Sequence, residues 1–182
     1  MKMNLKQLAL LAALLICSST VAAATTWSAQ DYDLYPGDFD GDGVPDMLYV
    51  AKDPGKLSGI ARGVGGGFDT SFQSWPSNFL GLQWSAGQYN VVVLQSTPGT
   101  GRFATILLQG TAAGASSYVL GANAQGRITG ISQTLTADWS AAAHRIVTGD
   151  FNNDEIPDVF LQATQPSGMN IVCAEQRVVP EG

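Results

Sequence analysis

The sequence predicts an all-β fold of repeated four-stranded antiparallel units that resemble β-propeller blades, about three of them, forming a partial or incomplete propeller. Three observations predict this fold. A Trp-Ser pair recurs at Trp27, Trp84 and Trp139, at spacings of 57 and 55 residues, which indicates an internal repeat. Short apolar runs separated by Gly, Pro, Asn and Asp follow each pair, as in strands joined by turns. After the N-terminal segment, no window has the apolar period of a helix.

The first 24 residues have the layout of a secretory signal peptide. Lys2 and Lys6 form a basic region, residues 8–16 form an apolar run, and Ala22–Ala24 supply a small-residue cleavage site. The apolar run is shorter than the ~20 residues that a membrane-spanning helix needs. We therefore expect cleavage after Ala24, a secreted or periplasmic protein, and no membrane span in the mature chain.

Charge and cysteine content narrow the class of protein. The formal net charge is −6, and loss of Lys2 and Lys6 with the signal peptide leaves about −8. This acidic balance argues against a nucleic-acid partner, because no basic patch is available to neutralise phosphates.

Cys173 is the one cysteine after the cleavage site, so we expect no internal disulfide and a small residue packed on a strand. Cys17 leaves lipoprotein processing open as an alternative.

The repeat divides residues 25–182 into units of roughly 27–83, 84–138 and 139–182, each with its strands in the same order. First strands are expected at 34–36, 91–95 and 146–148; second strands at 47–50, 105–109 and 159–162; third strands at 59–63, 116–122 and 169–174; and fourth strands at 68–75 and 128–135. The third unit runs out near residues 176–182, where its fourth strand should form.

A loop between the first two strands of the first unit concentrates acidic residues. The stretch DFDGDGVPD has carboxylates at positions one, three, five and nine, which are Asp38, Asp40, Asp42 and Asp46. Alternate spacing in a tight loop directs these side chains toward one centre, and Gly41 and Gly43 permit the sharp turns. The carboxylates would repel one another without a cation, and Ca²⁺ accepts six to eight oxygen ligands. The sequence therefore predicts a Ca²⁺ site, with the Val44 carbonyl as its backbone ligand.

Two other interpretations of this loop are an EF-hand and a metal-free turn. An EF-hand does not fit, because Tyr49 stands at position twelve, where an EF-hand has a bidentate Glu, and because Pro45 and a strand-like flank replace the expected helix. An Asp/Gly-rich turn without a metal is the second alternative. A turn alone, however, does not need four acids.

The third unit carries a related loop, DFNNDEIPD, which predicts a second Ca²⁺ site. Its predicted ligands are Asp150, Asn152, Asp154, Asp158 and the carbonyl of Ile156. This loop has one carboxylate fewer, and Asn153 and Glu155 replace the two glycines. A shared loop geometry would give Glu155 a positive φ at a cost of about 1 kcal/mol, so we expect weaker binding here, with a metal-free turn as the alternative. The middle unit has Thr100 and Ala104 where acids would align, and we expect it to bind no metal.

The stretches GDFDGDGVPDMLYV and GDFNNDEIPDVFLQ resemble the loop of FG-GAP, or VCBS-type, repeats, which occur in integrin α-chain propellers and in many secreted bacterial proteins. The resemblance covers most of the mature chain as three units. It implies a Ca²⁺-stabilised hairpin loop in each intact blade, with the residues named above as ligands.

These features favour a secreted calcium-binding scaffold, used for protein or carbohydrate binding or adhesion, over an enzyme. His144 occupies a repeat position that tyrosine holds elsewhere, which favours a structural ring over a general base, and no G-x-S-x-G nucleophile motif occurs. Asp31 and Asp33 lie outside the loop and leave a secreted hydrolase as a less favoured alternative. Trp75, which lies outside the repeat position, is the expected surface contact.

Three units are fewer than the four to eight blades of a closed propeller. A second copy would complete the ring, since exposed blade edges invite self-association. Two alternatives are that the chain is the N-terminal fragment of a larger toxin- or adhesin-like protein, and that it is a compact β-domain that shares only the loop with propellers.

Overall fold

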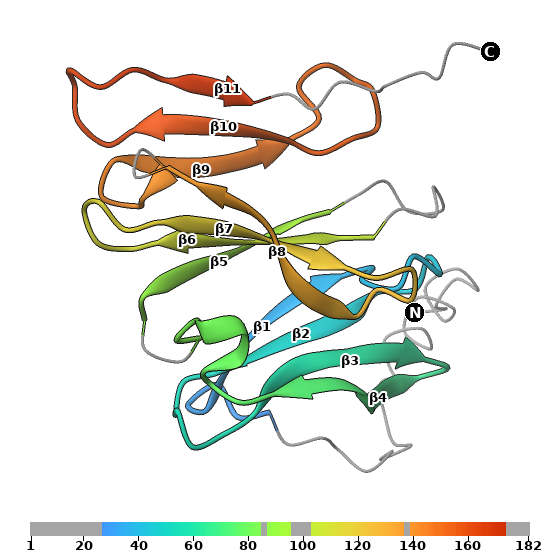
Figure 1. The fold of residues 1–182 in the computed structure, drawn as a ribbon. Helices are drawn as coiled ribbons and strands as arrows, with labels where there is room; N and C mark the ends of the chain where they lie inside the picture. The colour runs from blue at the N-terminus through green and yellow to red at the C-terminus, as the bar shows by residue number, and fades with distance from the viewer. Residues whose placement is uncertain (1–26, 85–86, 96–102, 137–138, 174–182) are drawn as a thin grey trace, which may run out of the picture.

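The structure, a computed structural model, describes residues 27–84, 87–95, 103–136 and 139–173. The predicted signal peptide, and the region expected to hold the fourth strand of the third unit, lie outside these residues. The described chain is all-β and forms three antiparallel sheets, one above another in Figure 1, so the predicted all-β class and internal repeat are confirmed. None of the described helical segments is long and apolar enough to cross a membrane.

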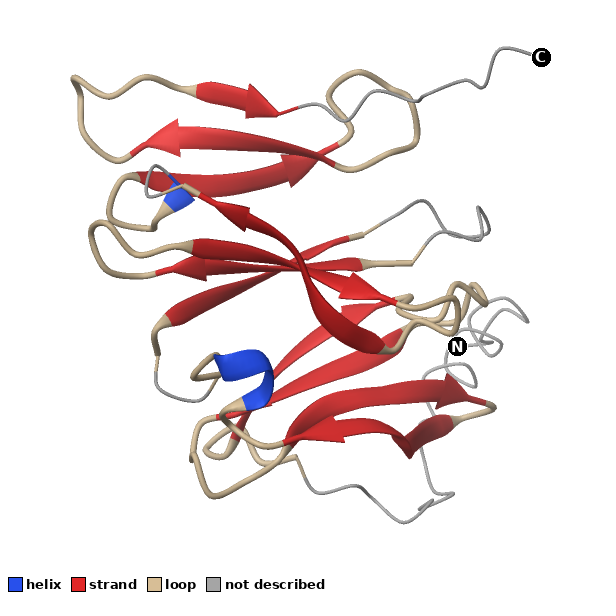
Figure 2. Cartoon of the chain, viewed as in Figure 1, coloured by secondary structure: helices blue, strands red, loops and turns tan. Residues whose placement is uncertain are grey.

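The three sheets have the same strand connectivity, in which each strand pairs with the next along the chain. The first sheet contains β1 (Tyr32–Gly37), β2 (Asp46–Ala51), β3 (Ser58–Val64) and β4 (Gly67–Trp75). The second contains β5 (Tyr89–Leu94), β6 (Thr105–Gly110), β7 (Ser117–Ala122) and β8 (Ile128–Leu135). The third contains β9 (His144–Gly149), β10 (Asp158–Ala163) and β11 (Ile171–Cys173). Figure 2 shows these strands with the short 3₁₀ helix Phe79–Gly81, which lies between the first two sheets in the chain. Every predicted strand is present, within a few residues of its expected ends.

The repeat is also visible in the hydrogen bonds of the Trp-Ser turns. In the first unit, the Ser28 carbonyl accepts the backbone N–H of Asp31 at 2.9 Å. In the third unit, the Ser140 carbonyl accepts the N–H of Ala143 at 3.0 Å. In the first and third units, the Trp-Ser pair therefore marks a tight turn that leads the chain into the first strand.

A second repeated feature is a hydrogen bond at the end of the second strand of each unit. No sequence motif predicted it. The last N–H of the strand donates to a side-chain oxygen seven residues later, at 2.9–3.0 Å, in the pairs Ala51–Ser58, Gly110–Ser117 and Ala163–Asn170. Such a bond satisfies a backbone donor where the strand ends. The small polar residue at the start of the third strand is thus part of the repeat.

The first and second sheets share one apolar core. β2 and β3 supply Leu48, Val50 and Ile60, and these pack with Ile106 and Leu108 of β6. All five side chains are at most 6% exposed. The alternation along these strands explains the arrangement, because every second residue of a strand points to the same face of its sheet.

Trp75 belongs to this core, so the prediction that it is a surface contact is wrong. Its side chain is 2% exposed, and its ring lies 5.0 Å from that of Phe79 and 5.1 Å from that of Trp84. Trp75 is the last residue of β4, and its alternation position turns it toward the second sheet. The repeat spacing did not predict this, because burial here depends on a neighbouring unit.

Polar contacts join the second and third sheets. The Gln109 side-chain amide on β6 donates to the carbonyls of Trp139, at 3.0 Å, and His144, at 2.8 Å. His144 is buried, and its Nε2 lies 3.0 Å from the Met169 carbonyl. Cys173, on β11, is half-buried, and burial raises the pKa of its thiol. A cavity of about 710 Å³ lies between these two sheets.

Candidate metal centre

The loop between β1 and β2 folds as its composition predicts. Gly41 and Gly43 have φ of 77° and 84°, in the left-handed region where glycine carries no steric penalty. These two residues reverse the chain twice within residues 38–45. The side chains of Asp38, Asp40 and Asp42 lie close together as a result, with Asp38 buried, Asp40 partly buried and Asp42 exposed.

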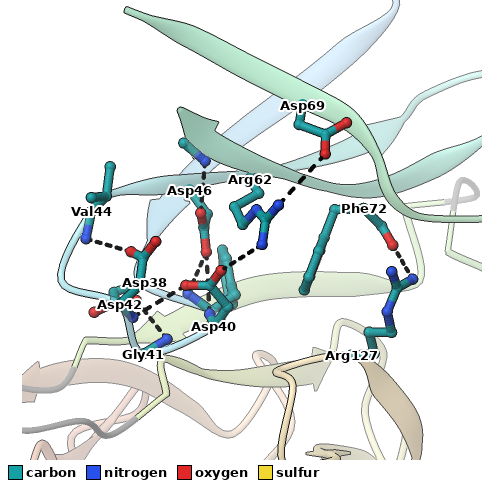
Figure 3. Close-up of polar contacts among 12 residues, drawn as sticks. Asp38, Asp40, Gly41, Asp42, Val44, Asp46, Arg62, Asp69, Phe72 and Arg127 are labelled. Atoms are coloured by element: carbon teal, nitrogen blue, oxygen red, sulfur yellow. Dashed lines mark hydrogen bonds and ion pairs between the residues drawn. The ribbon is translucent and has the colours of Figure 1, made fainter. Parts of the chain in front are cut away.

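These three aspartates form a cluster, here named the acid triad and drawn in Figure 3. One carboxylate oxygen from each of Asp38, Asp40 and Asp42 lies within 4.8 Å of the other two. Ca²⁺ binds oxygens at roughly 2.3–2.6 Å, so two oxygens on one ion can be up to ~5 Å apart. Both this spacing and the all-oxygen donor set fit a hard divalent cation. The acid triad could therefore hold a metal ion.

Backbone N–H groups fix the orientation of the triad. The Asp38 carboxylate accepts the N–H of Gly41 at 2.7 Å and that of Gly43 at 2.9 Å. The Asp42 carboxylate accepts the N–H of Val44 at 2.7 Å. A carboxylate has about four lone-pair sites, so these bonds leave oxygen positions free for a cation. Val44 closes the turn in this way, and the role of its carbonyl as a ligand stays a prediction.

Asp46, the fourth predicted ligand, lies beside the triad and ties the loop to the sheet. Its side chain is fully buried. Its Oδ2 accepts the N–H groups of Phe39, at 2.8 Å, and Asp40, at 3.2 Å, and its Oδ1 accepts that of Gly63 on β3 at 2.8 Å. Burial raises the pKa of Asp46, and these hydrogen bonds oppose the rise. The geometry thus gives Asp46 an anchoring role that the sequence pattern did not predict, while its role as a ligand stays untested.

Burial and the neighbouring carboxylates both disfavour the charged form of Asp40. The pKa of Asp40 is raised chiefly by burial and also by the carboxylates of Asp42 and Asp38, while the hydrogen bond from the Asp42 N–H and the charge of Arg62 act in the opposite direction. The Arg62 guanidinium lies 3.8 Å from the Asp40 carboxylate. One arginine at this distance offsets part of the negative charge of three carboxylates.

The second loop, between β9 and β10, repeats this backbone path at non-glycine residues. Asn153 and Glu155 have φ of 60° and 69°, which confirms the predicted positive φ of Glu155. The Asp150 carboxylate accepts the N–H groups of Asp154, at 3.0 Å, and Glu155, at 2.9 Å. Asp158 Oδ2 accepts the Phe151 N–H at 2.8 Å, as Asp46 Oδ2 does for Phe39.

The second loop nevertheless offers a poorer set of metal ligands. In the described part of this loop, no three Asp, Glu, His or Cys side chains bring one ligand atom each to within 4.8 Å of one another. The Asn152 side-chain amide donates to the Asp154 carboxylate at 3.2 Å, which satisfies part of its charge without a cation. Ile156 is buried, and its N–H donates to Asp154 at 2.9 Å. Asp158 Oδ1 is buried without a hydrogen-bond partner among the described residues.

The second unit packs directly on the first loop. The Ala104 N–H donates to the Asp38 carbonyl at 2.6 Å. Ala104 belongs to the middle loop that we expect to bind no metal, and residues 96–102 of that loop lie outside the described part of the chain. Gly126, in the turn between β7 and β8, has φ of 75° and lies against the backbone of Phe39 and Asp40 so closely that a Cβ there would overlap it. The loop of residues 38–45, here named the acid loop, is therefore part of the interface between the first and second sheets.

Two other candidate acids from the sequence have partners away from this loop. Asp31 pairs with Lys56 at 2.6 Å, and Asp33 pairs with Lys52 at 2.9 Å. These pairs lie on the exposed surface.

A small cleft beside the triad contains functional groups that the sequence reasoning missed. Its volume is about 330 Å³, and its lining residues are Asp40, Arg62, Asp69, Ser71, Phe72, Gln125 and Arg127. They come from the β1–β2 loop, β3, β4 and the β7–β8 turn, which only the tertiary fold brings together. No short motif marks these residues, and the register of β3 with β4 shifts between Ile60 and Arg62, which strand alternation alone would not predict.

No family model, curated protein or solved structure matched the chain. The geometry of the loops and sheets therefore carries the functional argument.

Proposed function

We propose that the chain is a secreted, calcium-binding β-repeat scaffold in which Ca²⁺ structures the loop of the first sheet. On this proposal its sheets act as propeller blades of the FG-GAP type and present a surface for a protein or glycan partner. It is not an enzyme on this proposal, and the metal has a structural role.

The acid triad is the observation that carries the proposal. Three carboxylate oxygens within 4.8 Å of one another, beside a buried fourth carboxylate, are costly to hold together without a cation. Oxygen-only ligands suit Ca²⁺, whose coordination geometry is flexible, better than Mg²⁺, which demands near-ideal octahedral geometry. The likeness of both loops to FG-GAP loops and the signal-peptide layout support the remaining parts of the proposal.

Calorimetric titration of Ca²⁺ into the purified chain without residues 1–24 tests the metal. We expect saturable uptake that Asp42→Asn weakens by at least tenfold, since this change removes one charged ligand from the triad. Asp33→Asn, which removes an exposed carboxylate on β1, serves as the matched control and should leave uptake unchanged. Equal uptake by Asp42→Asn and the wild-type chain would contradict the assignment of the site.

A further inference from the structure

The cleft beside the triad contains two guanidinium groups around one aromatic ring. Arg62, from β3, lies 5.8 Å from the centre of the Phe72 ring, and Arg127, from the β7–β8 turn, lies 4.7 Å from it. The ring is buried, with 6% of its residue exposed. Figure 3 shows both arginines beside Phe72, with the triad on the far side of Arg62. The first two sheets together thus position two cations at one opening.

Neither guanidinium is saturated by carboxylates. Arg62 lies 3.8 Å from Asp40 and 3.9 Å from Asp69, which is longer than the ~2.8 Å of a charge-assisted hydrogen bond. Arg127 donates through Nη1 to the Phe72 carbonyl, and in the described residues no carboxylate oxygen lies within 4.0 Å of its guanidinium. Both groups can therefore donate further hydrogen bonds into the cleft.

The local charge makes anion binding depend on the metal. The cleft contains two arginines and two aspartates, Asp40 and Asp69, while Asp38 and Asp42 add two negative charges at its edge. This sum is net negative and repels an anion. Asp46, buried beside the triad, adds a further negative charge. A divalent cation held by the triad would offset two of these negative charges and weaken the competition of Asp40 for Arg62.

We propose that this cleft binds the carboxylate of an acidic sugar unit, a hexuronate, and that it does so when the acid triad holds its cation. The inference rests on the proposed metal site and adds to it a ligand class and the residues that recognise it. Arg62 and Arg127 would hold the carboxylate, because a guanidinium matches its two oxygens with paired N–H donors.

The other lining groups favour a sugar over an acidic peptide side chain. Gln125 and Ser71 are neutral hydrogen-bonding groups suited to hydroxyls, and Ser71 Oγ keeps acceptor capacity while it donates to Asp69 at 2.6 Å. The guanidinium groups flank the Phe72 ring, so the cleft offers no open apolar surface to the backbone or methylene groups of a peptide. A volume of about 330 Å³ suits one small polar ligand.

The test titrates D-galacturonate into the protein in two states, metal-free after dialysis against resin-treated buffer and saturated with Ca²⁺. Metal uptake is measured first, by calorimetry on the same preparation. We expect D-galacturonate to bind at least tenfold more tightly to the Ca²⁺-saturated protein, and neutral D-galactose not to bind. Arg127→Gln and Arg62→Gln should each weaken binding by roughly tenfold or more, the range for hydrogen bonds to charged groups.

Arg145→Gln is the matched control, because it removes an exposed arginine from β9 on the third sheet and should leave binding unchanged. This inference would be overturned, with the metal site left intact, if the protein took up Ca²⁺ normally but did not bind D-galacturonate. The same holds if D-galacturonate binding did not depend on the metal, or if Arg127→Gln did not weaken it. Absent Ca²⁺ uptake would instead overturn the proposed function. Equal binding of N-acetyl-L-aspartate would overturn the choice of a sugar.

Discussion

At the scale of single residues, Asp46 connects the acid loop to the rest of the first sheet. Its buried carboxylate accepts three backbone N–H groups, from Phe39, Asp40 and Gly63. Asp46→Asn would put an amide N–H₂ where one carboxylate oxygen accepts these bonds. We expect a loss of about 2–4 kcal/mol in the free energy of unfolding, since a buried donor facing a donor leaves both unsatisfied.

Urea unfolding of the metal-free protein measures this loss apart from any effect on Ca²⁺. Asp53→Asn is the control, because Asp53 is an exposed acid in the β2–β3 turn and accepts one local N–H bond, from Gly55. A loss below about 0.5 kcal/mol for Asp46→Asn would show that the anchoring role is wrong.

Gly126 tests the contact between the β7–β8 turn and the acid loop. Its φ of 75° and the nearby backbone of Phe39 leave no room for a Cβ. Gly126→Ala should therefore destabilise the protein by about 2 kcal/mol or more, through strain and displacement of the turn. Gly130→Ala, in the neighbouring β8, is the matched control, because a Cβ there meets no atom within 4 Å. Thermal unfolding compares the two, and similar melting temperatures would contradict the packing described here.

At the scale of elements, the two acid loops share a backbone path, but the positions with positive φ are glycines in the first loop and Asn153 and Glu155 in the second. Glu155→Gly should stabilise the second loop by about 1 kcal/mol, because glycine adopts the left-handed region without the Cβ penalty. Asn153→Gly is the comparison and should change stability less, since Asn tolerates this region better. Chemical denaturation of both variants measures the difference, and a destabilised Glu155→Gly would mean that the Glu155 side chain contributes more than its strain costs.

The loops should also differ in metal affinity. Asp42→Ala removes a member of the triad, whereas Asp154→Ala removes an acid that Asn152 already contacts at 3.2 Å. We expect Asp42→Ala to abolish the tighter Ca²⁺ binding event and Asp154→Ala to affect a weaker one. Calorimetric titration separates the two, and equal losses would contradict the ranking.

At the scale of the whole molecule, local signals predicted the strands and both loops. The apolar runs at 47–50 and 105–109 became β2 and β6, because period-two burial and turn residues act over a few residues. The positive φ of Glu155 followed from comparing one loop with the other. Local spacing therefore accounts for the repeat and for the acid triad.

Contacts between units could not be predicted in this way. Trp75 is buried against Phe79 and Trp84 in the core that the first two sheets share. Arg127 lines the cleft beside the first loop because the β7–β8 turn packs on that loop through Gly126. The buried role of Asp46 likewise depends on the N–H of Gly63, which lies on the neighbouring strand β3, 17 residues further along the chain. These three features arise from pairing and stacking over long sequence separations, for which no short motif exists.

The central claim is that a bound divalent cation allows the clustered carboxylates to coexist in the folded chain. Thermal unfolding of the chain without residues 1–24, in Ca²⁺ and after metal removal, tests it most directly. At 100-fold excess of free Ca²⁺ over its Kd, mass action predicts about 2.7 kcal/mol of stabilisation, or a rise of roughly 5–10 °C in Tm. An unchanged Tm across the same Ca²⁺ range would contradict the claim.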